Sequence, residues 1–215
     1  HARIRPLGHS TKGRRVSNSR ALILTITRIE ADYLADLVEQ FISLLGDYSD
    51  EQPSAAAPAS PGAGAIAGAF GGPEATPEDP AIARLMPDAY ADGDAAAEFR
   101  RHTENDLVER RIRDARRVLA GLDMSLNEPV SGHVPHAVSD PQAPFDVVLD
   151  HEAGEAWMRT LAAVRLVVAS RLGIETEDDD AEARADDDED GRFGVYDWLG
   201  FRLDGIVQAL DDSEL

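Results

Sequence analysis

The stretch EFRRHTENDLVERRIRDARRVL, residues 98–119, decides what kind of fold this chain can adopt. It holds seven arginines and five acidic residues, in a chain of 215 residues with a net charge of −20. Acids lead arginines by four residues at Asp106–Arg110 and Glu109–Arg113, the order that stabilises a helix. Apolar residues within it and just after it follow helical spacing: Leu107, Val108, Ile112, Ala115, Leu119 and Leu122. We therefore predict an amphipathic scaffold helix with a mixed-charge outer face, and not a helix that reads nucleic acid.

The same stretch carries a second helix-start signal at Thr103, which is followed by acidic residues. This pattern predicts two helical pieces that meet at Thr103, with Asp94 as the cap of the first. Arg100 and Arg101 lie on the first piece, and we treat them as candidates for contact with a partner.

Helical periodicity recurs along most of the chain outside this stretch. Thr27 and Glu30 form a capping box, and we expect the helix that they open to end at Gly46. A short helix is predicted from Asp79 to a point before Pro87. Asp150 is expected to cap a long helix that Gly173 stops, and a last helix covers VYDWLGFRLDGIVQAL, residues 195–210.

Strand signals are confined to two places. Residues 2–27 alternate short β-like runs with turns, and Leu22, Leu24 and Ile26 share one face of the last run. The run FDVVLD, residues 145–150, is expected to join these strands because a lone strand cannot satisfy its backbone groups.

These elements predict a mainly α protein with a small N-terminal antiparallel β element (α+β), in which a helical bundle packs on a short sheet. We expect a single domain over residues 1–215. Three segments interrupt it: a disordered Pro/Gly/Ala linker at 47–78, a loop at 123–144 and an acidic loop at 175–192.

Composition excludes several classes of chemistry. There is no cysteine, so thiolate zinc sites, disulfides and thiol redox switching are impossible. There is no run of 18 apolar residues and no apolar signal-peptide core, so we expect a cytoplasmic protein that does not enter a membrane. His133, His136 and His151 show no zinc-site spacing, and the acidic run lacks the spacing of a calcium loop. We therefore predict no metal and no cofactor.

Catalytic signatures are also missing from the sequence. It contains neither Gly-x-Ser-x-Gly nor Ser-x-x-Lys, and no pair among its abundant carboxylates stands out as acid and base. We expect a protein that is not an enzyme. A carboxylate-lined cleft that binds or hydrolyses a small molecule is kept as an alternative.

Charge is segregated along the chain. Residues 1–20 carry six basic and no acidic groups, whereas residues 173–192 carry eleven acids and two arginines. A basic N-terminal hairpin is the better candidate for DNA contact, because a two-stranded ribbon fits the major groove. Docking of this hairpin on the acidic body is the competing interpretation. Its candidate contact residues are Arg3, Arg5, Lys12, Arg14 and Arg15.

Arg165 lies at the edge of the apolar face of its helix, between Leu161, Val164 and Val168. A partly buried guanidinium needs a carboxylate partner. The sequence therefore predicts an ion pair between Arg165 and either Asp197 or Glu104 where two helices meet.

Three blocks of sequence carry a family resemblance: ARLMPDAYADGDAAAEFRRHTE (83–104), AWMRTLAAVRLVVASRLGI (156–174) and VYDWLGFRLDGIVQAL (195–210). Together they resemble the AosR-like actinobacterial family, long filed as a domain of unknown function. The resemblance implies a soluble cytoplasmic regulator of transcription in the oxidative-stress response. Redox control in that family is attributed to a cysteine pair, which this chain does not have.

Taken together, we expect a regulatory protein that works by contact with a protein partner, with the transcription machinery as the candidate partner. Direct DNA binding through the basic hairpin is the first alternative, and the carboxylate-lined cleft is the second. The partner hypothesis predicts an exposed apolar patch beside the arginine-rich helix or around Trp198.

Overall fold

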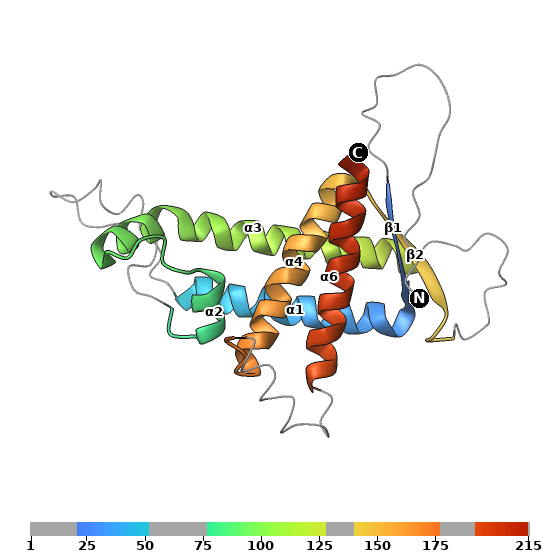
Figure 1. The fold of residues 1–215 in the computed structure, drawn as a ribbon, viewed down its shortest axis with the longest axis horizontal. Helices are drawn as coiled ribbons and strands as arrows, with labels where there is room; N and C mark the ends of the chain where they lie inside the picture. The colour runs from blue at the N-terminus through green and yellow to red at the C-terminus, as the bar shows by residue number, and fades with distance from the viewer. Residues whose placement is uncertain (1–20, 52–76, 128–139, 177–191, 215) are drawn as a thin grey trace, which may run out of the picture. The chain divides into compact units, whose positions relative to one another are not determined.

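The fold was obtained as a computed structural model, which describes residues 21–51, 77–127, 140–176 and 192–214 (Figure 1). It confirms the expected fold class, because the chain is mostly helical with a two-stranded antiparallel sheet. In chain order, the elements are β1 (Leu22–Thr27), α1 (Arg28–Glu51), α2 (Pro80–Leu85), α3 (Gly93–Asn127), β2 (Pro144–Leu149), α4 (His151–Arg171) and α6 (Arg192–Glu214). The predicted N-terminal hairpin partner of β1 falls in residues 1–20, outside the described residues.

The sheet joins the two predicted strand regions. β1 pairs with β2 antiparallel, from Leu22 opposite Leu149 to Thr27 opposite Pro144. Alternate residues of β1 are buried, as the period of two along a strand requires. The prediction that FDVVLD joins the N-terminal strand is thus confirmed.

Local chemistry sets several helix ends as the sequence predicted. The Thr27 amide donates to Glu30 Oε2 at 2.8 Å and the Glu30 amide to Thr27 Oγ1 at 3.3 Å, which completes the capping box. Asp79 and Asp150 accept hydrogen bonds from amides in the first turns of α2 and α4. Gly173 has a φ of 74°, and the amides of Gly173 and Ile174 close the last turn of α4.

Three predicted boundaries were wrong because helices run further than local signals suggest. α1 continues through Gly46 to Glu51, so residues 47–51 do not belong to a linker. α3 is one helix, and the Thr103 hydroxyl donates to the carbonyl of Phe99 at 2.9 Å instead of capping a new start. α3 also extends to Asn127, past the predicted loop start at residue 123.

The cap of α3 is also displaced from its predicted position. Asp92, not Asp94, accepts the hydrogen bond from the Ala95 amide, at 2.9 Å. Asp94 lies within the first turn of the helix, where a carboxylate complements the helix dipole.

The described residues group into two compact units. Unit 1 holds residues 21–40, 114–127, 140–162 and 197–214, and unit 2 holds 41–51, 77–113, 163–176 and 192–196. The expectation of a single domain stays a prediction. Unit 1 buries Leu22, Leu24, Ile26, Leu34, Val38, Val118, Leu122, Val147, Leu149, Trp157, Leu161, Leu199, Ile206 and Leu210. Unit 2 buries Phe41, Leu45, Tyr48, Ile82, Leu85, Met86, Val108, Val164 and Ile174.

The N-terminal end of α1 exposes two large apolar side chains. Ile29 and Tyr33 are exposed, whereas Ala31 and Leu34 are buried. Tyr33 makes an edge-to-face contact with Trp198 of unit 1, with ring centroids 6.1 Å apart.

One glycine in unit 1 marks a close approach between elements. A Cβ on Gly154, in the first turn of α4, would lie 2.9 Å from Leu22 Cδ1 and 3.1 Å from Leu210 Cδ2. The small residue therefore lets α4 meet both β1 and the end of α6.

Candidate functional site

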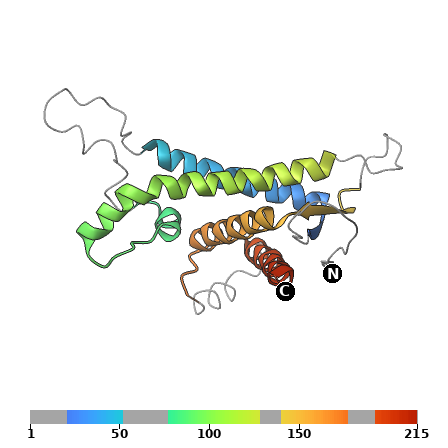
Figure 2. The ribbon, with the colours of Figure 1, turned by 90° about the horizontal axis from the view of Figure 1, so that it is seen from above.

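A cleft of about 380 Å³ opens in unit 2, a volume within the usual range for ligand pockets. α2 lies beside the N-terminal part of α3 in both views of the ribbon (Figures 1 and 2). The turn that connects the two helices completes the walls. The lining residues are Leu85, Met86, Pro87, Asp88, Ala89, Ala96, Phe99, Arg100, Thr103, Glu104, Leu107 and Arg111.

Short-range sequence signals place this turn. α2 ends at Leu85 because Pro87 follows two residues later and restricts the residue before it. Asp92 then starts α3, so the segment between them has only a few residues with which to cross from one helix to the next.

Hydrogen bonds to backbone carbonyls fix α2, which is too short to be stable alone. Arg111 Nη2 of α3 donates to the carbonyl of Leu85 at 2.8 Å. Arg84 Nη1 donates to the carbonyl of Ile174 at 2.6 Å, and Arg171 Nη2 pairs with Asp79 Oδ2 at 2.6 Å. The α2 wall of the cleft is therefore anchored at both ends.

A polar cluster, in which Arg100 and Glu104 are buried and Asp88 is exposed, forms one side of the cleft. Arg100 Nη2 donates to Asp88 Oδ1, and Arg100 Nε lies 3.4 Å from Glu104 Oε2. The Tyr48 hydroxyl, from α1, donates to Glu104 Oε1. Glu104 is only 2% exposed, and among the described residues its Oε2 accepts no hydrogen bond. An unmet acceptor of this kind is costly unless a proton or a donor reaches it.

The titration of this cluster follows from its burial. Burial raises the pKa of Glu104, against the lowering effects of the Tyr48 hydroxyl and the Arg100 guanidinium. Burial also raises the pKa of Tyr48, and the Glu104 carboxylate adds to that effect. Tyr48 therefore stays a hydrogen-bond donor, and Glu104 favours its protonated form more than an exposed carboxyl does.

The mouth of the cleft is apolar and exposed. Tyr90 and Phe99 form an edge-to-face pair with centroids 5.7 Å apart, and both rings are exposed. Leu107, on the same helix as Phe99, is also exposed. This meets the expectation of an exposed apolar patch beside the arginine-rich helix.

A second carboxylate cluster, in unit 1, surrounds Glu30. Glu30 Oε1 accepts hydrogen bonds from Trp198 Nε1 at 3.0 Å and from Arg202 Nη2, and Oε2 accepts from the amide and hydroxyl of Thr27. Burial raises the pKa of Glu30, but these four hydrogen bonds outweigh it and lower the pKa to about 2. Each oxygen has two donors, so this cluster offers no open acceptor.

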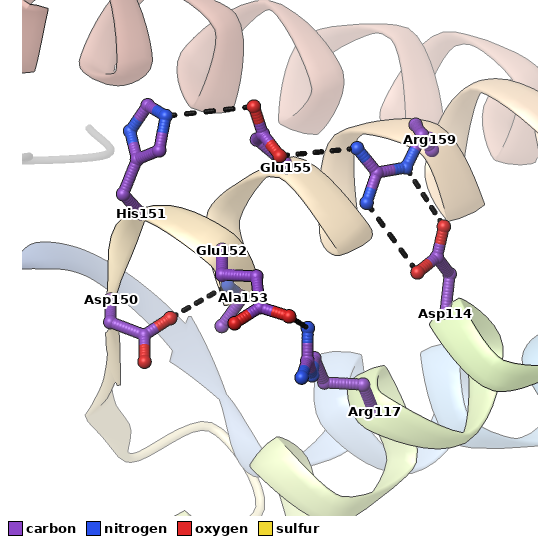
Figure 3. Close-up of polar contacts among 8 residues, drawn as sticks. All are labelled: Asp114, Arg117, Asp150, His151, Glu152, Ala153, Glu155 and Arg159. Atoms are coloured by element: carbon purple, nitrogen blue, oxygen red, sulfur yellow. Dashed lines mark hydrogen bonds and ion pairs between the residues drawn. The ribbon is translucent and has the colours of Figure 1, made fainter.

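A third polar group lies on the surface of unit 1, between α3 and α4 (Figure 3). Arg159 Nε donates to Asp114 Oδ2 at 2.8 Å, and Arg117 Nη1 donates to Glu152 Oε1 at 2.6 Å. His151 Nε2 lies 3.5 Å from Glu155 Oε1. Exposed pairs of this kind contribute little to stability. Asp114 and Arg117, both in the opening stretch, thus pair with side chains of α4.

The site residues predicted from the sequence lie in different places. The basic candidates at the N-terminus, Arg3, Arg5, Lys12, Arg14 and Arg15, lie outside the described residues. Arg100 lies in the cleft, but its guanidinium is buried in ion pairs instead of exposed for contact. Arg101 is half-buried on the same helix.

Of the two predicted ion-pair partners of Arg165, Glu104 was wrong. Glu104 is engaged by Tyr48 and Arg100 instead. The Arg165 guanidinium lies 3.8 Å from the centroid of the Tyr196 ring, and its Nε donates to the Tyr196 carbonyl at 3.4 Å. Pairing of Arg165 with Asp197 stays a prediction.

Sequence reasoning missed Tyr48, Asp88 and Phe99 as site residues. The spacing of Arg100 and Glu104, four residues apart on one helix face, is a signal that could have found the core of the cluster. Tyr48 has no such signal, and the predicted linker at 47–78 included it.

Metal chemistry has no support from the described side chains. Within residues 21–51, 77–127, 140–176 and 192–214, no three histidine or acidic side chains are grouped so as to hold an ion. Nor does any helix there have the length and apolarity needed to cross a bilayer.

The fold and cleft define a mainly helical α+β protein with an apolar, carboxylate-based pocket. A family model described as a domain of unknown function (DUF2017) matches residues 11–210. The chain therefore belongs to the DUF2017 family. No curated protein and no solved structure matches it.

Proposed function

We propose that this protein is a non-enzymatic cytoplasmic regulator that works by docking a protein partner in the cleft of unit 2. The observation that carries the proposal is the exposure of Phe99 and Leu107, which line the cleft, and of Tyr90, whose ring contacts Phe99. Large exposed apolar groups gathered at one place mark interaction sites. Aromatic side chains around a concave centre are also typical of the residues that dominate binding energy.

The resemblance of the 83–104, 156–174 and 195–210 blocks to the AosR-like family supports a role in transcription regulation, with the transcription machinery as the candidate partner. The cleft residues Asp88, Phe99, Arg100 and Glu104 all fall in the first of these blocks. The chain has no cysteine, so the trigger for such a regulator is not a thiol.

A comparison of variants of the full chain tests the proposal. Phe99→Ser removes an exposed ring at the cleft, and Met124→Ser removes an exposed apolar side chain of similar size in unit 1. The proposal expects that a protein captured from native lysate by the wild-type chain is also captured by Met124→Ser and lost with Phe99→Ser. The purified pair should then show the same order of affinities by calorimetry.

A cellular measurement checks the regulatory part. The native host, deleted for this chain, is complemented with each variant and its transcripts are compared. Phe99→Ser should reproduce the deletion profile and Met124→Ser the wild-type profile. Full complementation by Phe99→Ser, with normal circular dichroism, would overturn the cleft as the functional surface.

A further inference from the structure

We propose that the cleft receives a lysine or arginine side chain from a protein partner, with the cationic head near Asp88 and Glu104 and the apolar stem against Phe99. This inference rests on the proposed function and names the chemistry of the partner. It is carried by three features of unit 2: the sharing of Arg100 between two carboxyl groups, the unmet acceptor of Glu104 and the aromatic rim.

The sharing of Arg100 is the first feature. Arg100, which is buried, pairs with two carboxyl groups of the cleft, the exposed Asp88 and the buried Glu104. One guanidinium is thus shared by two carboxyl groups, and Arg111, which also lines the cleft, donates to the carbonyl of Leu85. A cation that enters the cleft would give these carboxyl groups a second charged donor. The net charge of −20 on the chain also raises the local concentration of cationic partners.

The unmet acceptor is the second feature. Glu104 lines the cleft, is almost fully buried, and within the described residues its Oε2 accepts no hydrogen bond, although Arg100 Nε lies 3.4 Å away. Ammonium and guanidinium groups carry several donors each. A charge-assisted hydrogen bond to a carboxylate is among the stronger polar contacts in proteins.

The rim is the third feature. Tyr90 and Phe99 offer aromatic surface, which attracts cations through the negative faces of the rings. Lysine and arginine also carry an alkyl stem that packs on apolar groups while the head stays polar. Met86, Pro87 and Leu107 supply such groups along the cleft. An anionic or purely apolar side chain would use the rim but bring no donor to Glu104 Oε2.

A protein segment fits better than a small free amine, because the exposed apolar surface extends beyond the space for one head group. Leu107 lies two helical turns from Phe99 on α3, and the Tyr90 ring contacts the Phe99 ring. A peptide with a basic residue next to an apolar residue would contact both.

Selection of random peptides displayed on phage, with the full chain as bait, tests the inference. We expect enriched peptides to carry lysine or arginine beside a large apolar residue. Synthetic copies should bind in fluorescence anisotropy, and replacement of the basic residue by norleucine should weaken binding about tenfold or more. Glu104→Gln in the full chain should weaken it to a similar degree, while Glu109→Gln, exposed on the same helix, should not.

The outcomes separate this inference from the proposed function. Enriched peptides that need Phe99 but carry acidic or only apolar residues would overturn the cation and leave the docking cleft standing. Peptides whose binding survives both Phe99→Ser and Glu104→Gln would overturn both. Urea unfolding of each variant establishes that it is folded, and Asp88→Asn provides a second carboxylate variant if Glu104→Gln fails this check.

A last arm concerns the basic residues 1–20 of the chain itself. In the full chain, Arg3, Arg5, Lys12, Arg14 and Arg15 are replaced together by glutamine. The inference expects unchanged peptide affinity. A gain of about tenfold would show that this segment competes for the cleft, and would overturn a separate protein as the occupant.

Discussion

Glu30 in unit 1 and Glu104 in unit 2 are two helix carboxylates that each lie near one arginine, yet their pKa values shift in opposite directions. Glu30 accepts four hydrogen bonds, and its pKa falls to about 2. Glu104 is more deeply buried, accepts one hydrogen bond from Tyr48, and has a raised pKa. Desolvation raises the pKa of both carboxyl groups, but only Glu30 accepts enough hydrogen bonds to offset that effect.

The difference indicates which carboxylate stabilises the fold and which is available to a ligand. A saturated carboxylate holds β1, α1 and α6 of unit 1 together and has no capacity left. An undersatisfied one retains capacity at some expense to stability, as functional sites often do. The following expectations test this contrast, from the largest effect to the smallest.

Glu30→Gln should have the largest effect, because it leaves the buried Arg202 guanidinium without its counter-charge. We expect a loss of about 2–3 kcal/mol in the free energy of unfolding near neutral pH. Urea denaturation measures it, with Glu39→Gln, an exposed residue on the same helix, as the matched control. Equal losses in the two variants would contradict the conclusion that the Glu30 carboxylate stabilises unit 1.

The pH dependence of that loss comes next. The lowered pKa of Glu30 means that its contribution is present above the ordinary pKa of 4.5 and is lost as the pH falls toward about 2. The gap between wild type and Glu30→Gln should therefore shrink by about 2 kcal/mol across this window. Urea curves at a series of pH values measure the gap. A gap that is the same at every pH would mean that Glu30 acts by packing and not by charge.

Glu104→Gln should change stability in the opposite sense. A raised pKa means that the carboxyl contributes stability below its ordinary pKa and loses it as the pH rises through the folded-state pKa. Glutamine keeps an acceptor for Tyr48 without the buried charge, so we expect a gain of about 1 kcal/mol on the alkaline side. Arg100 and Asp88 remain paired in this variant. A loss of similar size near neutral pH would show that Glu104 is as structural as Glu30.

Arg159→Gln should have the smallest effect, because its pairs with Asp114 and Glu155 lie on the surface of unit 1 (Figure 3). We expect about 0.5 kcal/mol or less, reduced further by salt. Thermal unfolding at low and high salt measures it. A loss as large as that of Glu30→Gln would show that the Arg159 pairs stabilise unit 1 as strongly as the Glu30 cluster does.

Local chemistry made the fold largely predictable. Thr27, Asp150 and Gly173 set helix ends through contacts within a few residues, and the period of two in β1 identified its buried face. Prediction failed where distant residues decide. Gly46 has the features of a helix end, yet α1 continues and buries Tyr48, whose hydroxyl meets Glu104, 56 residues later in the chain.

The candidate site was less predictable for the same reason. The sequence singled out Arg100 and Glu104. It predicted that Arg100 contacts a partner and named Glu104 as one candidate ion-pair partner of Arg165. Whether a charged side chain is exposed or buried depends on which elements cover it, and that information is spread over α1, α2 and α3.

The contacts of Arg202 also constrain the order in which the chain can complete its fold. Arg202 donates to the carbonyl of Thr25 and to Glu30, residues 177 and 172 positions earlier. Because synthesis proceeds from the N-terminus, β1 and the start of α1 are made long before these donors exist. Unit 1 can therefore complete its fold only after α6 has been synthesised. In a nascent chain that stops before α6, Glu30 and the Thr25 carbonyl lack the hydrogen bonds from Arg202.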